Sequence, residues 1–319
     1  MVGSIYMPKI DTNRRLVIEP IPTSKNDAHP EPPHHLLPKH EFSLGIIAPK
    51  GSGKTNLMLN LLKFYKGYFH TIFIFSPSVE NDSKWDEIKN LPMLAENKAL
   101  KKALNKISRS DKKKLKGVVD EIPVDDLNDL MPSKVNGVEP MDVDKFDPYI
   151  PEDNFFAEYD GDKLSEIVSE QKKMIKFLKK HGYSKATSNR ILILFDDLVG
   201  SPAFSAQRSN PYKILSANHR HSSISTISIV QAYKELMKTA RTQLSGLILF
   251  RSFNEKELEV IREEYPMSMH KDDWCEVYDY CTKEPFDFLY YNIRGKIREA
   301  QVMKNFDEYI VTPYKPLKF

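Results

Sequence analysis

Short apolar runs alternate with amphipathic stretches along most of the chain. The apolar runs of strand length cover residues 42–47, 71–76, 191–195, 224–230, 246–250 and 288–293. Between the first two runs, leucines recur at helical spacing over residues 54–65, so a strand, a helix and a strand follow in order. Parallel strands that are buried on both faces are typically continuous apolar runs. The pattern therefore predicts an α/β fold with a central, mostly parallel sheet flanked by helices.

Two regions depart from this pattern. The first 40 residues contain seven of the 21 prolines, and proline at this density disrupts helices and sheets alike. We predict a Pro-rich N-terminal arm over 1–40 and a sheet domain over 41–312. We also predict a charged insertion at 85–153 and a C-terminal tail over 313–319. Four histidines of the arm are interpreted as solvated loop residues, because no carboxylate or thiolate frame surrounds them: His29, His34, His35 and His40.

The charge of the chain is nearly balanced, with 47 basic and 44 acidic residues and a net charge of +3. This balance excludes a histone-like polybasic chain and an acidic tail protein. Residues 98–116 nevertheless carry a net charge of +8, and residues 120–153 carry −9. The simplest interpretation is a solvated loop. The alternative is that the basic block contacts DNA phosphates, or is shielded by the acidic block until DNA competes.

Membrane and secretory classes are not supported by the sequence. The longest apolar runs fall short of the ~20 residues that span a bilayer, and the first residues lack the pattern of a secretory signal. Cys275 and Cys281 are the only cysteines. We interpret them as reduced packing thiols of an intracellular protein.

The strongest chemical signal is the segment APKGSGKT at 48–55, which is a phosphate-binding loop pattern with Ala48 in place of the first glycine. In such a loop, backbone N–H groups surround the β-phosphate, and glycines allow the close approach. We expect Lys54 to reach the β- and γ-phosphates and the Thr55 hydroxyl to ligate Mg²⁺. The expected nucleotide contacts are Ala48, Pro49, Lys50, Gly51, Ser52, Gly53, Lys54, Thr55 and Asn56.

Two carboxylates end the apolar run ILILFDD at 191–197. Ligand sites lie beyond the carboxyl ends of parallel strands, so Asp196 and Asp197 are expected beside Lys54. We assign Asp196 to the metal and Asp197 to the attacking water. The alternative is that an aspartate here caps a following helix.

Gln231 ends the apolar run that follows, and at the same edge of the sheet it can contact the γ-phosphate or the attacking water. Two arginines are candidates for a residue inserted into the site of a neighbouring subunit, Arg220 and Arg241. Surface ion pairs are the alternative for both. We favour Arg220 slightly.

Together these segments resemble the viral genome-packaging ATPases of the FtsK–HerA superfamily, in the poxvirus-type branch of large DNA viruses and virophages. The matching segments are GIIAPKGSGKTNLMLNLL (45–62), TIFIFSPS (71–78), ILILFDDLVG (191–200) and the stretch from 214 to 243. GLILFRSFNEKELEVIREEY (246–265) fits the next strand and helix, and FLYYNI and KNFDEYI (288–293, 304–310) fit the closing segments. The resemblance covers about 42–84 and 154–310.

The resemblance implies a RecA-like P-loop NTPase sheet of the ASCE type and a motor that hydrolyses ATP with Mg²⁺. Such motors translocate double-stranded DNA into a capsid. The implied partners are double-stranded DNA, viral capsid proteins and further copies of the chain in a ring of five or six, without stable membrane insertion. The implied location is the host cytoplasm or virus factory, or the virion. Lys54, Thr55, Asp196 and Gln231 match by position; Ala48 and Asp197 depart from the family pattern, Asp197 standing where cellular relatives usually have glutamate.

Two other classes of P-loop protein are alternatives. A regulatory GTPase would explain the D-x-x-G pattern of Asp197 and Gly200, but the chain lacks the guanine-reading N-K-x-D sequence. A small-molecule kinase usually needs an arginine-rich lid, whereas the charged insertion is rich in lysine. Both alternatives predict nucleotide binding at the same loop. They differ from the motor in nucleotide preference and in the product formed.

Overall fold

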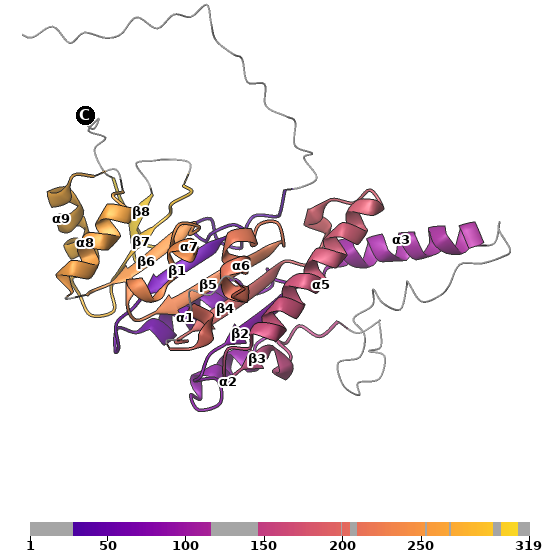
Figure 1. Cartoon of the computed structure of the whole chain (residues 1–319), viewed down its shortest axis with the longest axis horizontal. Helices are drawn as coiled ribbons and strands as arrows, with labels where there is room; N and C mark the ends of the chain where they lie inside the picture. The colour runs from indigo at the N-terminus through magenta and orange to yellow at the C-terminus, as the bar shows by residue number, and fades with distance from the viewer. Residues whose placement is uncertain are drawn as a thin grey trace, which may run out of the picture.

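The sheet is the centre of the molecule. The computed structural model describes residues 28–115, 146–198, 200–204, 209–252, 254–267, 269–295 and 301–311. A nine-stranded sheet has the order β3-β2-β4-β5-β1-β6-β7-β8-β9 (Figure 1). The strands are β1 (Ser43–Ile47), β2 (Thr71–Phe75), β3 (Phe155–Phe156), β4 (Ile191–Asp196), β5 (Ile224–Val230), β6 (Gly246–Phe250), β7 (Phe288–Tyr291), β8 (Val302–Lys304) and β9 (Glu308–Ile310).

Strands β1 to β6 pair in parallel, and β7, β8 and β9 continue the sheet antiparallel. All six predicted runs form strands, and the predicted class, a mostly parallel sheet flanked by helices, is confirmed. The sequence missed β3, β8 and β9, which are only two or three residues long. Such short strands carry too few residues to show a period.

Helices cover both faces of the sheet (Figure 1). They are α1 (Lys54–Phe64), α2 (Lys84–Lys89), α3 (Lys98–Leu115), α5 (Gly161–Lys180), α6 (Pro211–Asn218), α7 (Lys238–Arg241), α8 (Glu255–Glu264) and α9 (Lys271–Cys281). Alternate residues of β4 face the two layers. Leu192 and Leu194 join the core that contains α1 and α2, whereas Ile193 and Phe195 join the core that contains α5 and α6. Burial on both faces explains why β4 is an unbroken apolar run.

The region predicted as a charged insertion begins inside the main core. Trp85 on α2 is fully buried there. The basic block is helical rather than a loop, because α3 runs from Lys98 to Leu115. Leu100 and Ala103 of α3 pack against Leu178 of α5, and the rest of α3 leads away from the sheet (Figure 1). Most of the acidic block lies outside the described residues, so the boundaries of the insertion stay a prediction.

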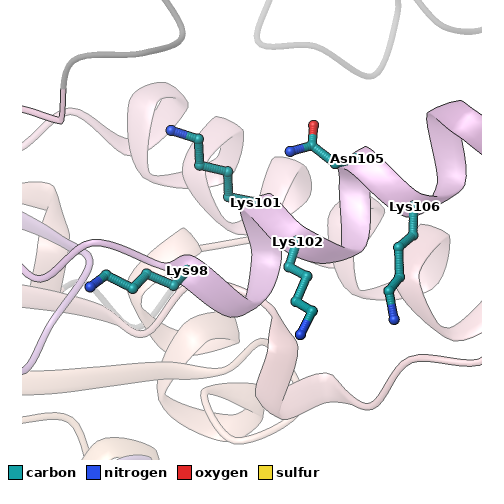
Figure 2. A pocket seen from close by; sticks show the side chains of 5 residues that line it. All are labelled: Lys98, Lys101, Lys102, Asn105 and Lys106. Carbon is teal, nitrogen blue, oxygen red and sulfur yellow. The ribbon is translucent and has the colours of Figure 1, made fainter.

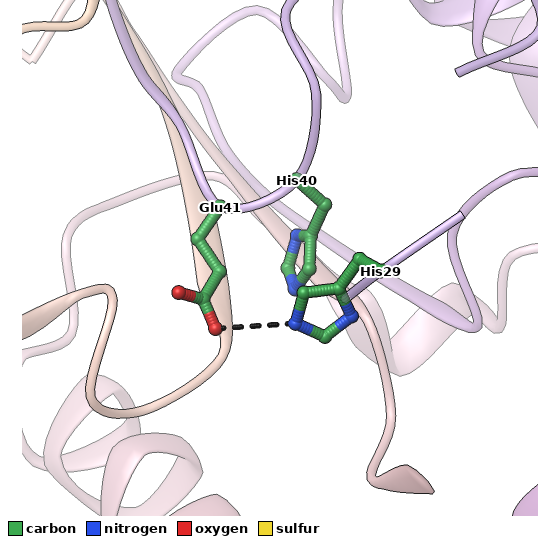
Figure 3. A group of neighbouring side chains, drawn as sticks. All are labelled: His29, His40 and Glu41. Atoms are coloured by element: carbon green, nitrogen blue, oxygen red, sulfur yellow. Dashed lines mark hydrogen bonds and ion pairs between the residues drawn. The ribbon is translucent and has the colours of Figure 1, made fainter. Parts of the chain in front are cut away.

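The end of the N-terminal arm packs onto the sheet domain. His34 and His35 are exposed as predicted, but the solvated interpretation is wrong for His29 and His40, which are 7% and 4% exposed. Figure 3 shows His29 and His40 beside Glu41, with His29 Nε2 3.3 Å from Glu41 Oε1. Residues 1–27 of the arm and 312–319 of the tail lie outside the described residues.

A hydrogen-bonded cluster holds this end of the arm at the amino-terminal edge of the sheet. His40 Nδ1 lies 2.7 Å from Ser225 Oγ and its Nε2 lies 3.2 Å from Ser223 Oγ. Burial holds the pKa of His40 well below its usual value, so the ring is neutral. The Lys185 ammonium lies 2.7 Å from Glu41 Oε1. That charge competes with any metal cation for the carboxylate, so we interpret the cluster as an anchor for the arm.

Both cysteines are free thiols, but only Cys281 is buried, so the packing role predicted for Cys275 is wrong. Burial raises the pKa of the Cys281 thiol to about 12, which makes it inert. Among the described helices, none combines the length and the apolar character that a membrane crossing requires.

Candidate nucleotide-binding site

The predicted chemical residues gather at the carboxyl edge of the sheet. Strands β1, β5 and β4 are neighbours and run in parallel, so the segments that follow them emerge side by side. Lys54 follows β1, Asp196 and Asp197 end β4, and Gln231 follows β5. Continuous apolar strands thus carry their polar residues to one edge, as parallel topology requires.

The loop after β1 has the backbone conformation that its glycines permit. Gly51 and Gly53 have φ values of 82° and 89°, in the left-handed region that side chains disfavour. Helix α1 begins directly after Gly53, and the Leu57 N–H donates to the Gly53 carbonyl at 3.0 Å. The first turn of α1 therefore points its free N–H groups and positive dipole end at the loop. This is the arrangement that binds phosphate groups.

Lys54, Asp197 and Gln231 form a connected group. Lys54 Nζ lies 3.2 Å from Asp197 Oδ2, and Gln231 Nε2 donates to Asp197 Oδ1 at 2.7 Å. Asp197 has a φ of 52°, which is uncommon for a residue other than glycine, although aspartate tolerates it better than most residues. Three segments far apart in the sequence therefore hold one carboxylate at the mouth of the loop.

Asp196 points into the protein instead. It is 2% exposed, and its Oδ2 accepts a hydrogen bond from Ser76 Oγ at 2.8 Å. Its Oδ1 is buried and has no hydrogen-bond partner among the described residues. Burial raises the pKa of Asp196, and the Ser76 hydrogen bond and the Lys54 charge partly oppose that shift. A buried carboxylate with one unpaired oxygen suits a cation or a cation-bound water.

A chain of donors leads to Asp196 from the other side of the sheet edge. Trp85 Nε1 donates to Ser78 Oγ at 2.9 Å, and Ser78 Oγ lies 2.9 Å from Ser76 Oγ. Because the Ser76 hydroxyl donates its only proton to Asp196, Ser78 must donate to Ser76. Sequence reasoning missed these three residues. The available signal was Ser76 itself, a polar residue ending an apolar strand just as Asp196 and Gln231 do.

The backbone around Gln231 is fixed by two glutamates that the sequence did not single out. Glu235 Oε2 accepts hydrogen bonds from the N–H groups of Gln231 and Ala232, at 3.0 and 3.1 Å. Glu257, which is 6% exposed, accepts from the N–H of Tyr233. Carboxylates thus replace the strand partners that the chain loses as it leaves β5. They hold the Gln231 side chain toward Asp197.

The residues expected to hold Mg²⁺ are compatible with that ion. Thr55 is the second residue of α1 and Asp196 ends β4, so a hydroxyl and a carboxylate approach the loop from β1 and β4. Mg²⁺ prefers oxygen ligands and usually keeps several waters. The unpaired Oδ1 of Asp196 is the feature of this structure that fits the ion.

A cavity of about 1,090 Å³ adjoins the loop on the side of β6. Residues 49–52 of the loop form one wall. Residues 250–252 after β6 and residues 282–287 before β7 form the opposite walls. Typical small-molecule sites measure roughly 300–1,000 Å³. The cavity therefore has room for a group larger than a phosphate.

The structure places the two candidate arginines differently. Arg220 is exposed and precedes β5, so it lies at the amino-terminal edge, away from Lys54 of its own chain. Arg241 is engaged within its own chain: its Nη2 lies 3.4 Å from Glu264 Oε1, and its guanidinium stacks 4.7 Å from the Tyr233 ring centre. Of the two, Arg220 has the exposed side chain, whereas Arg241 is tied to residues of its own chain.

Comparison with known proteins gives one family match and several structural neighbours. The sequence profile of the Poxvirus A32 protein family matches residues 135–284. This match confirms the resemblance to a poxvirus-type protein that the sequence motifs indicated. It includes the Asp196, Asp197 and Gln231 segments but begins after the phosphate loop at 48–55. No curated protein sequence matches the chain.

Among solved structures, the chain is similar to the genome packaging NTPase B204 from Sulfolobus turreted icosahedral virus 2 in complex with AMP. That match has 12% identity and a TM-score of 0.46, and it covers 87% of this chain and 98% of B204. The B204 complex with ATP-gammaS matches with 14% identity and a TM-score of 0.44, covering 85% and 98%. The cytoplasmic domain of the Thermomonospora curvata Type VII Secretion ATPase EccC matches with 11% identity and a TM-score of 0.36, covering 87% and 26%.

Proposed function

We propose that this chain is an Mg²⁺-dependent ATPase that moves double-stranded DNA, most directly in packaging a viral genome into a capsid. The observation that carries the proposal is the group at the carboxyl edge of the sheet. A phosphate-binding loop, a buried aspartate and an aspartate–glutamine pair converge there from three neighbouring strands. The Poxvirus A32 family match supports the viral assignment.

The roles of the residues follow from their contacts. Lys54 can exchange Asp197 for the β- and γ-phosphates, because its ammonium already lies at the mouth of the loop. Asp197 then retains Gln231 as its donor on Oδ1 and has Oδ2 free to accept a proton from the attacking water. The water oxygen bonds to the γ-phosphorus as the bond to the β-phosphate oxygen breaks, which yields ADP and inorganic phosphate.

The metal ion would be held by Thr55 and Asp196. When bound, Mg²⁺ neutralises charge that develops on the phosphates. The chain contributes an oriented carboxylate: Ser76 fixes Oδ2 of Asp196 at 2.8 Å and leaves Oδ1 for the ion or its water. A second function for Asp196, as a simple helix cap, is not supported, because the residue is buried and its oxygens accept no hydrogen bond from a helix N–H in the described part of the chain.

Assembly into a ring would complete the site. Arg220 is exposed at the edge of the sheet opposite to Lys54. A head-to-tail ring pairs two different surfaces of the subunit, and in the ring that we propose the surface with Arg220 faces the nucleotide site of the next subunit. An arginine in that position raises turnover about 10³- to 10⁵-fold in related chemistry.

The DNA contact that we propose is a lysine surface formed by α3 and the second half of α5. Figure 2 shows Lys102 and Lys106 projecting from the same side of α3. Nine lysines and no acidic residues occur in 98–108 and 171–180 together. Of these nine lysines, only Lys101 forms an ion pair with another described residue, at 3.9 Å from Glu96. The members of the surface are Lys98, Lys101, Lys102, Lys106, Lys172, Lys173, Lys176, Lys179 and Lys180.

This lysine surface predicts a salt-dependent affinity for DNA. Each lysine–phosphate contact adds about 0.9 to the slope of log affinity against log salt concentration. The double variant Lys102→Ala/Lys106→Ala should therefore lower the slope by up to about 2. The matched control is Lys66→Ala/Lys84→Ala, which removes the same charge elsewhere. An unchanged slope in the first variant, measured by fluorescence anisotropy with labelled DNA, would remove the lysine surface from the proposal.

The nucleotide site is tested by Lys54→Ala. Loss of this ammonium should lower ATP turnover by about 10²-fold or more, as for other residues that stabilise transition-state charge. Lys63→Ala is the control, because Lys63 lies on the same helix and, among the described residues, its ion pair is with Glu87 alone. If Lys54→Ala hydrolyses ATP at the parent rate, the site has been assigned wrongly.

A further inference from the structure

The cavity beside the phosphate loop has an exposed aromatic side chain at its rim. Phe286 lines it and is 67% exposed, the most exposed phenylalanine among the described residues. An aromatic side chain that is exposed at the rim of a cavity is available for contact with a ligand. Phe250 also lines the cavity, but it is only 4% exposed, so Phe286 offers the accessible aromatic face there.

The Phe286 ring lies against the phosphate loop. A Cβ atom placed on Gly53 would lie only 2.8 Å from Phe286 Cδ1, so the ring touches the loop immediately before Lys54. A nucleoside whose phosphates occupy the loop extends its sugar and base away from Lys54. The cavity with Phe286 at its rim begins where the phosphate site ends.

The backbone at Phe286 is held in an unfavourable conformation. Its φ of 72° is rare for a bulky residue, and strain of this kind costs about 1–3 kcal/mol and clusters at ligand-binding sites. The next residue is fixed firmly: Asp287 pairs with Lys304 at 2.8 Å and accepts from Asn305 Nδ2 at 2.6 Å. The loop before β7 therefore presents the ring in a preset position.

A second feature of the same cavity is an unpaired hydroxyl. Ser52 lines the cavity, and its Oγ is buried without a hydrogen-bond partner in the described part of the chain. Hydroxyls that are buried in proteins are almost always paired. The unpaired Ser52 Oγ lies where the phosphate loop borders the cavity, and a shift of the loop around a bound ligand would bring it to a partner.

We propose that Phe286 stacks on the nucleobase of the bound nucleotide and that this cavity is the nucleoside subsite. The inference rests on the proposed nucleotide site and adds the residue that distinguishes a nucleotide from a bare polyphosphate. Stacking of a base on an aromatic side chain is tolerant of base identity, because every base has a π-face. Phe286 therefore sets affinity for the nucleoside, and discrimination between purines is left to polar groups.

The test compares ATP with inorganic tripolyphosphate, which fits the loop but has no base. Phe286→Ala should raise the KM for ATP by about 5- to 100-fold, the range measured for loss of one stacked base. It should leave kcat and the inhibition constant of tripolyphosphate within about twofold of the parent. Phe64→Ala is the control, since Phe64 is another exposed phenylalanine, at the far end of α1. It should change none of the three.

A direct readout comes from Phe286→Trp. The two native tryptophans are buried, at 0% and 2% exposure, so the new indole supplies the exposed component of the fluorescence. ATP should quench that component and tripolyphosphate should not. If Phe286→Ala weakens ATP and tripolyphosphate equally, the residue only shapes the loop and the inference is overturned. Unchanged constants for both ligands overturn it as well.

The failure of the wider proposal has a separate signature. If tripolyphosphate and ATP both fail to bind the parent protein, or if Lys54→Ala leaves binding of both intact, the phosphate site is wrong. If tripolyphosphate binding depends on Lys54 but the Phe286 variants behave like the parent, the phosphate site is correct and the nucleoside subsite is wrong.

Discussion

The two edges of the sheet both bury polar side chains, but they treat them differently. At the amino-terminal edge, both nitrogens of His40 have hydrogen-bond partners and both oxygens of Glu41 contact Lys185. Among the described residues at this edge, two buried ring nitrogens have no hydrogen-bond partner, Nδ1 of His29 and Nε2 of His219. At the carboxyl edge, Asp196 keeps an unpaired carboxylate oxygen. Asp197 sits there in a left-handed backbone conformation.

This difference separates a structural cluster from a chemical one. A buried polar group that is fully paired stabilises the fold. An unpaired buried carboxylate lowers the stability of the fold unless a bound ligand offsets the cost of its burial. The amino-terminal edge therefore anchors the arm, and the carboxyl edge carries the chemistry. Mutations should separate accordingly: those at the carboxyl edge should change turnover, and those in the buried cluster of His40 and Glu41 should change stability. Arg220, exposed at the amino-terminal edge, lies outside that cluster.

The largest expected effect follows from Asp197→Asn. The amide keeps the size of the side chain but cannot accept a proton from water, so hydrolysis should fall by about 10²- to 10⁴-fold, the usual contribution of a general base. ATP binding should stay within a fewfold of the parent, because Lys54 remains. Single-turnover hydrolysis and equilibrium binding separate the two. Equal loss of binding and turnover would show that Asp197 only holds Lys54 in place.

A smaller effect is expected from Ser76→Ala, which removes the donor to Asp196 Oδ2. Residues that orient a metal ligand typically change metal affinity about 10- to 100-fold, so the Mg²⁺ concentration for half-maximal turnover should rise by that factor. Ser78→Ala, one step further along the donor chain, should give a weaker change in the same direction. A Mg²⁺ dependence that is identical in all three proteins would contradict the role of Ser76.

How much of this site the sequence predicts depends on the kind of signal each residue carries. Lys54 belongs to a local motif, and Asp196 and Gln231 interrupt apolar runs, so each is visible without its partner. Ser76 also ends an apolar strand, but serine is common in loops. Its meaning lies in a contact with Asp196, 120 residues away.

The errors have the same origin. His29 and His40 were interpreted as solvated because the sequence shows no carboxylate or thiolate frame around them. The partners that bury His40, Ser223 and Ser225, lie 183 and 185 residues away in the chain. The strongly basic sequence of α3 favoured a solvated loop. The segment is a helix instead, and its Leu100 and Ala103 pack on α5. Long-range partners decide such positions, and one sequence does not display them.

The smallest expected effect is an acid sensitivity of stability at the amino-terminal edge. Burial lowers the pKa of His70 to about 3, and the pKa of His40 is also lowered. Below about pH 6.5 the unfolded chain takes up protons at these residues and the folded chain does not. Stability is therefore complete above about pH 6.5 and is lost as the pH falls, by at most about 1.4 kcal/mol per pH unit for each histidine.

The variant His70→Gln tests this prediction, because glutamine keeps a polar side chain that does not titrate. Thermal unfolding between pH 7.5 and 5 should show a shallower loss of Tm in this variant than in the parent. His34→Gln is the control, since His34 is exposed. A slope that His70→Gln and His34→Gln leave equally unchanged would mean that the buried histidines do not drive the acid sensitivity. Turnover at pH 7.5 should be the same in all three proteins.

The central claim is that nucleotide hydrolysis at the carboxyl edge is coupled to double-stranded DNA. The most direct measurement is the steady-state rate of ATP hydrolysis with Mg²⁺, recorded with and without double-stranded DNA at low salt, with GTP as a parallel substrate. The account predicts that DNA raises the rate of ATP hydrolysis and that ATP is preferred to GTP. A rate that DNA leaves unchanged, or a preference for GTP, would contradict it.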